Sequence, residues 1–263
     1  MRVSALYRYP LKGFSPERLP RVMLAVGGHF PADRMFAIEN GASGFDPASP
    51  VHQPKIKFLM LMKNEEIARL STRYDDDAGV LTIRHEGREV ARGNLATQQG
   101  RDAITDFLTS YVTPGARRGP LRLLSAPDGF RFTDSRSGFV SLINAASLAD
   151  LEDRLGAPVD PLRFRGNILL EGLKPWEEFS LVDRVLEAPS GLRLRISKRI
   201  DRCAATAVDP QTGLRDLPVV KTLMAGYGHI DCGVYAEIIG AGSLAEGHHL
   251  RVLDGEAPES LGL

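Results

Sequence analysis

Cysteine is scarce in this chain, and its scarcity excludes several kinds of site. The 263 residues include only two cysteines, Cys203 and Cys232, and no Cys-x-x-Cys pair. Zinc sites of the finger type and self-contained iron–sulfur clusters take their ligands from several closely spaced cysteines. Both kinds of site are therefore disfavoured, and a structural disulfide is not expected in a reducing compartment.

An excess of one charge and long apolar runs are missing as well. Lys plus Arg and Asp plus Glu both number 33, so the formal net charge is zero. A general nucleic-acid binder carries a basic excess, although a neutral chain still has room for a local basic pocket that binds a small anion. No apolar run approaches the length of a membrane span, and the first ten residues lack the apolar core of a signal peptide. We expect a cytoplasmic protein that binds neither nucleic acid nor membrane.

Short segments with strand patterning make up most of the chain. Residues 2–9 alternate between apolar and polar, with Val3, Ala5, Tyr7 and Tyr9 on one face. Further strands are expected at residues 22–26, 35–38, 80–83, 88–91, 167–170, 181–186, 192–196, 234–239 and 249–253.

Helical spacing is confined to three places. Residues 98–111 have it, as do residues 218–226, and Ser147 is a candidate N-cap for a helix that ends at Gly156. Many short strands with few helices predict a mainly β (α+β) fold, in which a small β-rich N-terminal domain precedes a β-barrel domain. The run of Pro, Gly and Arg at residues 114–120 is the best linker, so we place the two domains at residues 1–115 and 120–255.

Cys203 is the residue whose surroundings point most directly to chemistry. Lys198, Arg199 and Arg202 precede it, and nearby cations favour the thiolate, which is both a nucleophile and a ligand for soft or high-valent metals. Asp201 opposes that effect. The run from Asp209 to Gly213 has the composition of a tight turn. From local chemistry alone, a buried structural cysteine explains Cys203 equally well.

Several segments together resemble the MOSC family, named for the C-terminal domain of molybdenum cofactor sulfurases. Residues 202–213 match its Arg-Cys, then Val-Asp-Pro, then Thr-Gly signature. The segments at 141–148, 163–168 and 233–238 match family segments in the same order, the second being Arg-Phe-Arg-Gly-Asn-Ile. Tyr-Pro-Leu-Lys-Gly at 9–13 and Asp-Arg-Met-Phe at 33–36 resemble the N-terminal β-barrel domain of two-domain members. The resemblance therefore spans nearly the whole chain.

The resemblance implies a cofactor and a set of residues that hold it. Two-domain members, which include the mitochondrial amidoxime-reducing component and bacterial relatives, carry a molybdenum cofactor (Mo-molybdopterin) with the cysteine as a metal ligand. Cys203 takes that role here, both as metal ligand and as the catalytic position. The implied cofactor-binding residues are Lys12, Arg34, Ser141, Asn144, Arg165, Asn167, Arg202 and Cys203. Arginine suits a phosphate because it engages it with two parallel donors.

Taken singly, these residues have plainer interpretations. Lys12 and Arg34 would be solvated surface charges, Arg165 would pair with a carboxylate, and Asn144 would cap the helix near Ser147. The chain also departs from the family pattern. Gly13 replaces a serine, Gly166 replaces a proline, and Asp201 stands where some relatives have a small polar residue.

The expected activity is an oxidoreductase that removes oxygen from N-hydroxylated small molecules. The chain has no cysteines for a ferredoxin domain, so electrons are expected from a separate protein of the ferredoxin or flavoprotein type. Three alternatives stay open: Cys203 as a persulfide carrier, the protein as a store or carrier of molybdenum cofactor, and a redox disulfide between Cys203 and Cys232. Surface loops such as residues 41–54 are expected to shape the substrate pocket.

Overall fold

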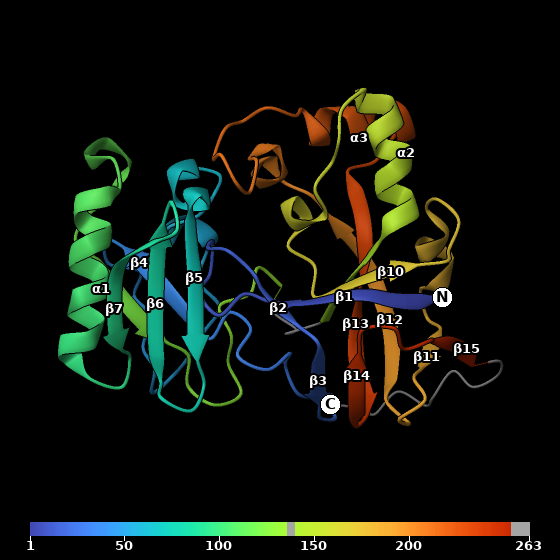
Figure 1. The fold of residues 1–263 in the computed structure, drawn as a ribbon, viewed down its shortest axis with the longest axis horizontal. Coiled ribbons are helices and arrows are strands. Elements are labelled where there is room, and N and C mark those ends of the chain that lie inside the picture. The colour runs from blue at the N-terminus through green and yellow to red at the C-terminus, as the bar shows by residue number, and fades with distance from the viewer. Residues whose placement is uncertain (136–139, 254–263) are drawn as a thin grey trace.

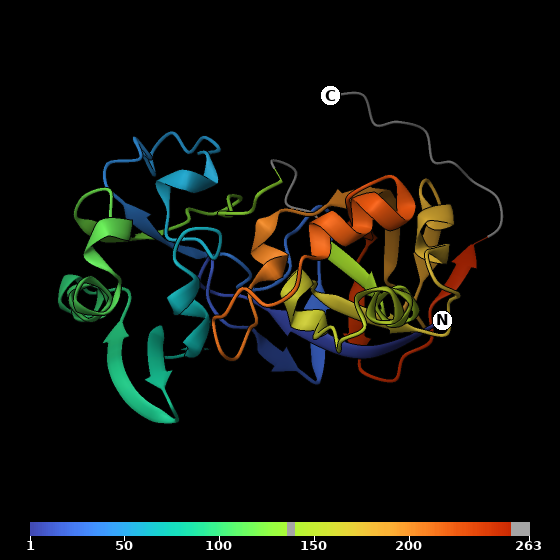
Figure 2. The same cartoon turned by 90° about the horizontal axis from the view of Figure 1, so that it is seen from above.

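A computed structural model describes residues 1–135 and 140–253 of the chain. Within these residues the structure is mainly β, with fifteen strands and three α-helices. The elements form two lobes (Figure 1). Viewed from above, helix α1 lies at one end of the molecule, and α2 and α3 lie together toward the other (Figure 2). None of the helices in the described ranges is both long and apolar enough to cross a membrane.

The larger lobe is built on an eight-stranded sheet. Its strands in spatial order are β15 (Arg251–Leu253), β11 (Val185–Glu187), β12 (Arg193–Asp201), β13 (Asp231–Gly240), β9 (Val140–Asn144), β10 (Ile168–Glu171), β1 (Arg2–Arg8) and β2 (Glu17–Leu19). Only the β9–β10 pair is parallel. A two-stranded sheet joins β3 (Arg21–Leu24) to β14 (Gly242–Ala245).

Alternating apolar side chains hold this sheet against its core. Val234, Ala236 and Ile238 on β13 are buried, as are Leu194 and Ile196 on β12. Because side chains on a strand point alternately to opposite faces, this spacing buries one face of each strand. Helices α2 (Ala145–Leu155) and α3 (Val219–Tyr227) cover the end of the sheet near Cys203.

The smaller lobe has two sheets and one long helix. Strands β4 (Phe36–Asn40) and β8 (Leu121–Ser125) pair with each other, and β5 (Leu70–Asp75), β6 (Val80–His85) and β7 (Arg88–Asn94) form a three-stranded meander. Helix α1 (Gln98–Tyr111) starts at Thr97, whose hydroxyl accepts a bond from the Gly100 amide. A Cβ added to Gly93 would lie 2.0 Å from the Gly100 carbonyl oxygen, so glycine is needed where α1 contacts β7.

Several sequence-based expectations match the structure and others do not. The strands expected at residues 80–83 and 88–91 are confirmed as β6 and β7, which pair as a hairpin, and the bounds of α1 are confirmed as well. The single buried face predicted for residues 2–9 is wrong, since Leu6 is buried and Tyr7 only half-buried; a bulge between Val3 and Ala5 breaks the alternation. The N-cap of α2 is Asn144 instead of Ser147. The mainly β class is confirmed, and the β-barrel form of the larger lobe stays a prediction; β3 and β14, which follow β2 and β13 after one residue each, pair with each other and so join strands from distant parts of the large sheet.

The two lobes do not correspond to two consecutive parts of the chain. Strands β1 to β3 belong to the sheets of the larger lobe, while β8, which follows the predicted linker, pairs with β4 in the smaller one. Two segments therefore cross between the lobes, and the residues that follow β1 lie where the lobes meet. Lys12, a predicted cofactor-binding residue, and Gly13 are in that segment.

Candidate functional site

A cavity of about 550 Å³ lies between the two lobes. Its wall includes residues from the start of the chain, from the smaller lobe and from the β12 end of the larger lobe. Seven of the eight residues predicted for the site line it: Lys12, Arg34, Ser141, Arg165, Asn167, Arg202 and Cys203. Residues far apart in sequence thus share one wall.

One region of the wall is a cationic cluster built on Tyr9. The guanidinium carbons of Arg34 and Arg165 lie 4.4 and 4.3 Å from the centre of the Tyr9 ring, which is fully buried. Arg34 also donates to the carbonyl oxygen of Arg165 at 2.9 Å and to the Asp33 carboxylate at 2.5 Å. Burial raises the pKa of Tyr9 to about 12. The phenol therefore stays neutral and does not cancel the charge of the two arginines.

Arg165 has capacity for a ligand. Burial and the neighbouring Arg34 charge lower its pKa to about 10. One terminal nitrogen, Nη1, donates to the Phe14 carbonyl at 2.6 Å, whereas Nη2 is buried and has no hydrogen-bond partner in the described structure. A buried donor without a partner is unfavourable. An anion at this position would supply the missing acceptor and the missing negative charge.

Lys12 is a third cation in the wall, and it is 8% exposed. Its Nζ donates to the Phe132 carbonyl at 2.8 Å and forms an ion pair with Asp134. Burial lowers the pKa of Lys12, although Asp134 acts in the opposite direction. Burial alone would raise the pKa of Asp134, but Lys12 outweighs it and keeps that carboxyl below its usual pKa. A bound anion would compete with Asp134 for this lysine.

Ser141 and Asn167 connect the neighbouring strands β9 and β10. The Ser141 hydroxyl donates to Asn167 Oδ1 at 2.8 Å, and the Asn167 side-chain amide donates to the Tyr7 carbonyl at 3.1 Å. Both residues line the cavity. These hydrogen bonds hold β9, the start of β10 and the end of β1 together beside Arg165.

Cys203 follows the end of β12 and precedes a short 3₁₀ helix, Ala204–Ala207. Its thiol is half-buried in the cavity wall. The predicted turn after it is confirmed: Asp209 Oδ1 accepts from the backbone amides of Gln211 and Thr212 at 3.0 and 2.7 Å. Gly213 has a φ of +72°, and a Cβ there would lie 2.9 Å from the Glu65 carbonyl oxygen. The loop therefore touches the smaller lobe.

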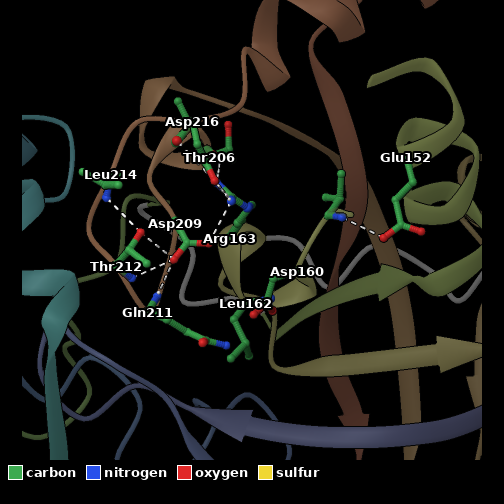
Figure 3. Close-up of polar contacts among 12 residues, drawn as sticks. Glu152, Asp160, Leu162, Arg163, Thr206, Asp209, Gln211, Thr212, Leu214 and Asp216 are labelled. Carbon is green, nitrogen blue, oxygen red and sulfur yellow. Dashed lines mark hydrogen bonds and ion pairs between the residues drawn. The ribbon is translucent and has the colours of Figure 1, made fainter. Parts of the chain in front are cut away.

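Arg163 ties this loop to the larger lobe (Figure 3). Its guanidinium donates to both carboxylate oxygens of Asp216 at 2.8 and 2.7 Å and to Asp209 at 3.0 Å. It also reaches the Ala207 carbonyl at 3.3 Å. We call Arg163, Asp209 and Asp216 the Arg163 cluster. Sequence reasoning missed its role, although Arg163 lies in a matched segment and both aspartates flank the predicted turn.

Of the three cations that precede Cys203 in sequence, two line the cavity with it and one does not. Arg202 is buried in the cavity wall and donates to the carbonyls of Cys232 and Phe164 at 2.7 and 2.8 Å. Arg199 lies over the Phe179 ring at 4.2 Å and does not line the cavity. Lys198 does line it.

Asn144 lies outside the cavity wall. Its side-chain oxygen accepts from the Ala146 amide, and its side-chain nitrogen donates to Glu178, Ser147 and the Lys174 carbonyl at 2.8 to 3.0 Å. These bonds use its polar groups at the start of α2. We therefore leave Asn144 out of the proposed site.

The second cysteine has a structural environment. Both cysteines are free, and Cys232 is fully buried in an apolar cluster. Burial raises its pKa to about 12. A thiol held protonated in this way is a poor partner for thiol–disulfide exchange, which argues against the redox disulfide.

Comparison with known protein families matches each half of the chain to a domain model. The family model described as the MOSC N-terminal beta barrel domain matches residues 1–114, and that of the MOSC domain matches residues 130–251. The chain belongs to the MOSC family. Both domains occur in the expected order, so it is a two-domain member.

Characterised relatives of this MOSC protein are similar at low identity. It is 24% identical over 238 residues to mitochondrial amidoxime-reducing component 1 of Mus musculus and 26% identical over 234 residues to the Homo sapiens protein of that name. Each alignment covers 81% of this chain and 67% of the relative. Among solved structures, the YuaD protein of Bacillus subtilis aligns over 95% of this chain and 94% of its own, with 12% identity and a TM-score of 0.45.

Two departures from the MOSC family pattern have local causes in the packing. Gly166 stands where the family has proline, and a Cβ there would lie 2.4 Å from Ile143 Cγ1. Gly13 stands where relatives have serine; it has a φ of +88°, and a Cβ would lie 3.0 Å from the Leu59 carbonyl oxygen. In this MOSC protein, both positions accept only glycine without rearrangement. Asp201, the third departure, is an exposed residue of the cavity wall.

Proposed function

We propose that this MOSC protein is a molybdenum-cofactor-dependent oxidoreductase that reduces N-hydroxylated small molecules. The observation that carries the proposal is that one cavity contains both a half-buried thiol, Cys203, and a cationic wall in which Arg165 has a buried donor without a partner. A thiol and an anion site in one cavity fit a cofactor that has a metal to be ligated and a phosphate to be held. The similarity to proteins named amidoxime-reducing components supports the same choice.

Each part of the wall has a role in this proposal. Arg34, Arg165 and Lys12 hold the phosphate through charge-assisted hydrogen bonds. Arg202, Ser141 and Asn167 would contact the pterin, and Cys203 would ligate the molybdenum. When bound, the cofactor supplies two-electron redox chemistry. In the overall reaction, an N–OH group plus two electrons and two protons gives N–H and water, and a separate electron-donor protein of the ferredoxin or flavoprotein type supplies the electrons.

Metal analysis tests the cofactor part of the proposal. Protein purified from a cofactor-competent host is expected to contain about one molybdenum per chain, since the cavity offers a single thiol ligand. Cys203→Ala should lose the metal. Cys232→Ala is the matched control, because it removes the other thiol, which lies outside the cavity wall, and should retain the metal. Wild-type protein without molybdenum would refute the proposal.

Turnover tests the reaction. Loaded protein should reduce benzamidoxime to benzamidine with reduced methyl viologen as the electron donor. Loaded protein that fails to do so would favour a carrier of molybdenum cofactor. Protein without molybdenum but with a persulfide on Cys203 would instead favour sulfur transfer.

A further inference from the structure

We propose that Arg163 is a positioning residue. It holds Cys203 in the cavity wall at a fixed position relative to the anion-binding arginines, Arg34 and Arg165. The inference rests on the proposed role of Cys203 as a metal ligand. Arg163 itself is 5% exposed, so its side chain is almost entirely enclosed by the loop and the larger lobe. Arg163 also lines the cavity, but its hydrogen bonds go to the loop, so we assign it a positioning role.

Two arginines hold the loop that bears Cys203: Arg163 from the larger lobe, and Arg215 within the loop, which donates to the Ala204 carbonyl at 3.3 Å and to Glu65 at 3.0 Å. Between the end of β12 at Asp201 and the start of α3 at Val219, its regular structure is the one-turn helix Ala204–Ala207. The Arg163 cluster ties Asp209, near the middle of this segment, and Asp216, near its end, to one guanidinium. The bond to the Ala207 carbonyl extends that contact to the helix that begins immediately after Cys203. A single side chain therefore restrains both sides of the turn.

The turn that carries Arg163 also carries the anion site. Arg163 lies in the 3₁₀ helix Pro161–Phe164. Arg165, the first residue after this helix, has φ 53° and ψ 37°. This left-handed conformation reverses the chain. As a result Arg163 points to the loop (Figure 3), while Arg165 stacks on Tyr9 in the cavity wall. Between them, the Phe164 carbonyl accepts from Arg202, the neighbour of Cys203. The three consecutive residues 163–165 thus link the loop that bears Cys203 to the cationic part of the cavity wall.

A general contribution to stability is the plainer role for Arg163, and Arg8 offers a matched control. Arg8 is 8% exposed and also pairs with two carboxylates, Glu17 at 2.7 Å and Asp76 at 2.6 Å. It lies on β1 and does not line the cavity. Substituting it removes the same number of ion pairs from a buried arginine without touching the Cys203 loop.

The test is the rate at which iodoacetamide alkylates Cys203 in the folded full chain, isolated from a host that makes no molybdenum cofactor. Cys232 is fully buried, and Cys203→Ser serves as the blank. Arg163→Gln should raise the rate about fivefold or more, because a loop without its anchor opens locally at lower free energy. Arg163→Lys should rescue part of this effect. Arg8→Gln should change the rate less than about twofold at a similar loss of thermal stability.

Asp216→Asn keeps the test usable if Arg163→Gln does not fold. It removes the charge of a partner that is partly exposed, and we expect a rate increase of about threefold. Equal rates in the Arg163 and Arg8 variants, compared at equal thermal stability, would overturn the proposal. Alkylation is measured without the metal, so absence of molybdenum in wild-type protein would refute the proposed function and leave this result standing.

Discussion

Gly166 lies between two cavity residues, Arg165 and Asn167, and its packing yields a quantitative prediction. A Cβ at this position would be 2.4 Å from Ile143 Cγ1 and 3.3 Å from Ile143 Cδ1. Carbon atoms in contact prefer about 3.5 Å, so the two groups would have to separate by about 1 Å. Ile143 is 2% exposed on the central strand β9, where it has little room to move.

We expect Gly166→Ala to cost about 2 kcal/mol of unfolding free energy, as overpacked cores do. Ile143→Ala removes the obstructing Cγ1 and should cost about 3 kcal/mol through the cavity it leaves. In the double variant the new methyl group occupies part of that cavity, so the total should fall about 2 kcal/mol below the sum of the single costs. The same overlap explains why the proline of the family pattern is absent here, since proline also has a Cβ.

Urea denaturation of the four proteins measures these free energies. Trp176 is the single tryptophan of the chain, and it packs against the apolar cluster that contains Ile143, so its fluorescence reports on the affected region. Costs that add to within about 0.5 kcal/mol would refute the steric explanation, because non-interacting sites behave in that way. A Gly166→Ala variant as stable as wild type would refute it as well.

Three further predictions concern the cavity and its borders. Asp134→Asn should tighten pyrophosphate binding about fivefold in titration calorimetry, because it removes the carboxylate that competes for Lys12, a contribution of about 1 kcal/mol for a partly exposed pair. Burial lowers the pKa of Arg165 to about 10, so pyrophosphate binding should weaken as pH rises toward 10, where the free protein loses this proton; the burial of Lys12, which lowers its pKa, acts in the same direction, and unchanged affinity would contradict this assignment. Asn144→Ala should cost about 2 kcal/mol through the lost cap and the lost hydrogen bond to buried Glu178, yet leave the molybdenum content unchanged, whereas metal loss at full stability would return Asn144 to the site.

The sequence alone determined the features that depend on neighbours in the chain. The bounds of α1, the β6–β7 hairpin and the turn that starts at Asp209 follow from periodicity, caps and turn residues, which act over a few positions. The motif at residues 202–213 likewise indicated where the chemistry of a MOSC protein should lie. Domain bounds at 1–115 and 120–255 and a cytoplasmic location stay predictions.

Only the tertiary structure decided how the site is assembled. Tyr9 lies between Arg34 and Arg165, and Lys12 meets Asp134, although more than a hundred positions separate some of these partners. Such pairings arise from packing of β1 into the sheet of the larger lobe, and no local pattern encodes them. The positions of Asn144, Arg199 and Arg163 were likewise decided by the tertiary structure. The family resemblance placed Asn144 in the site, sequence proximity placed Arg199 near Cys203, and neither pointed to Arg163. Side-chain direction turned Asn144 and Arg199 away from the cavity and Arg163 toward the loop of Cys203.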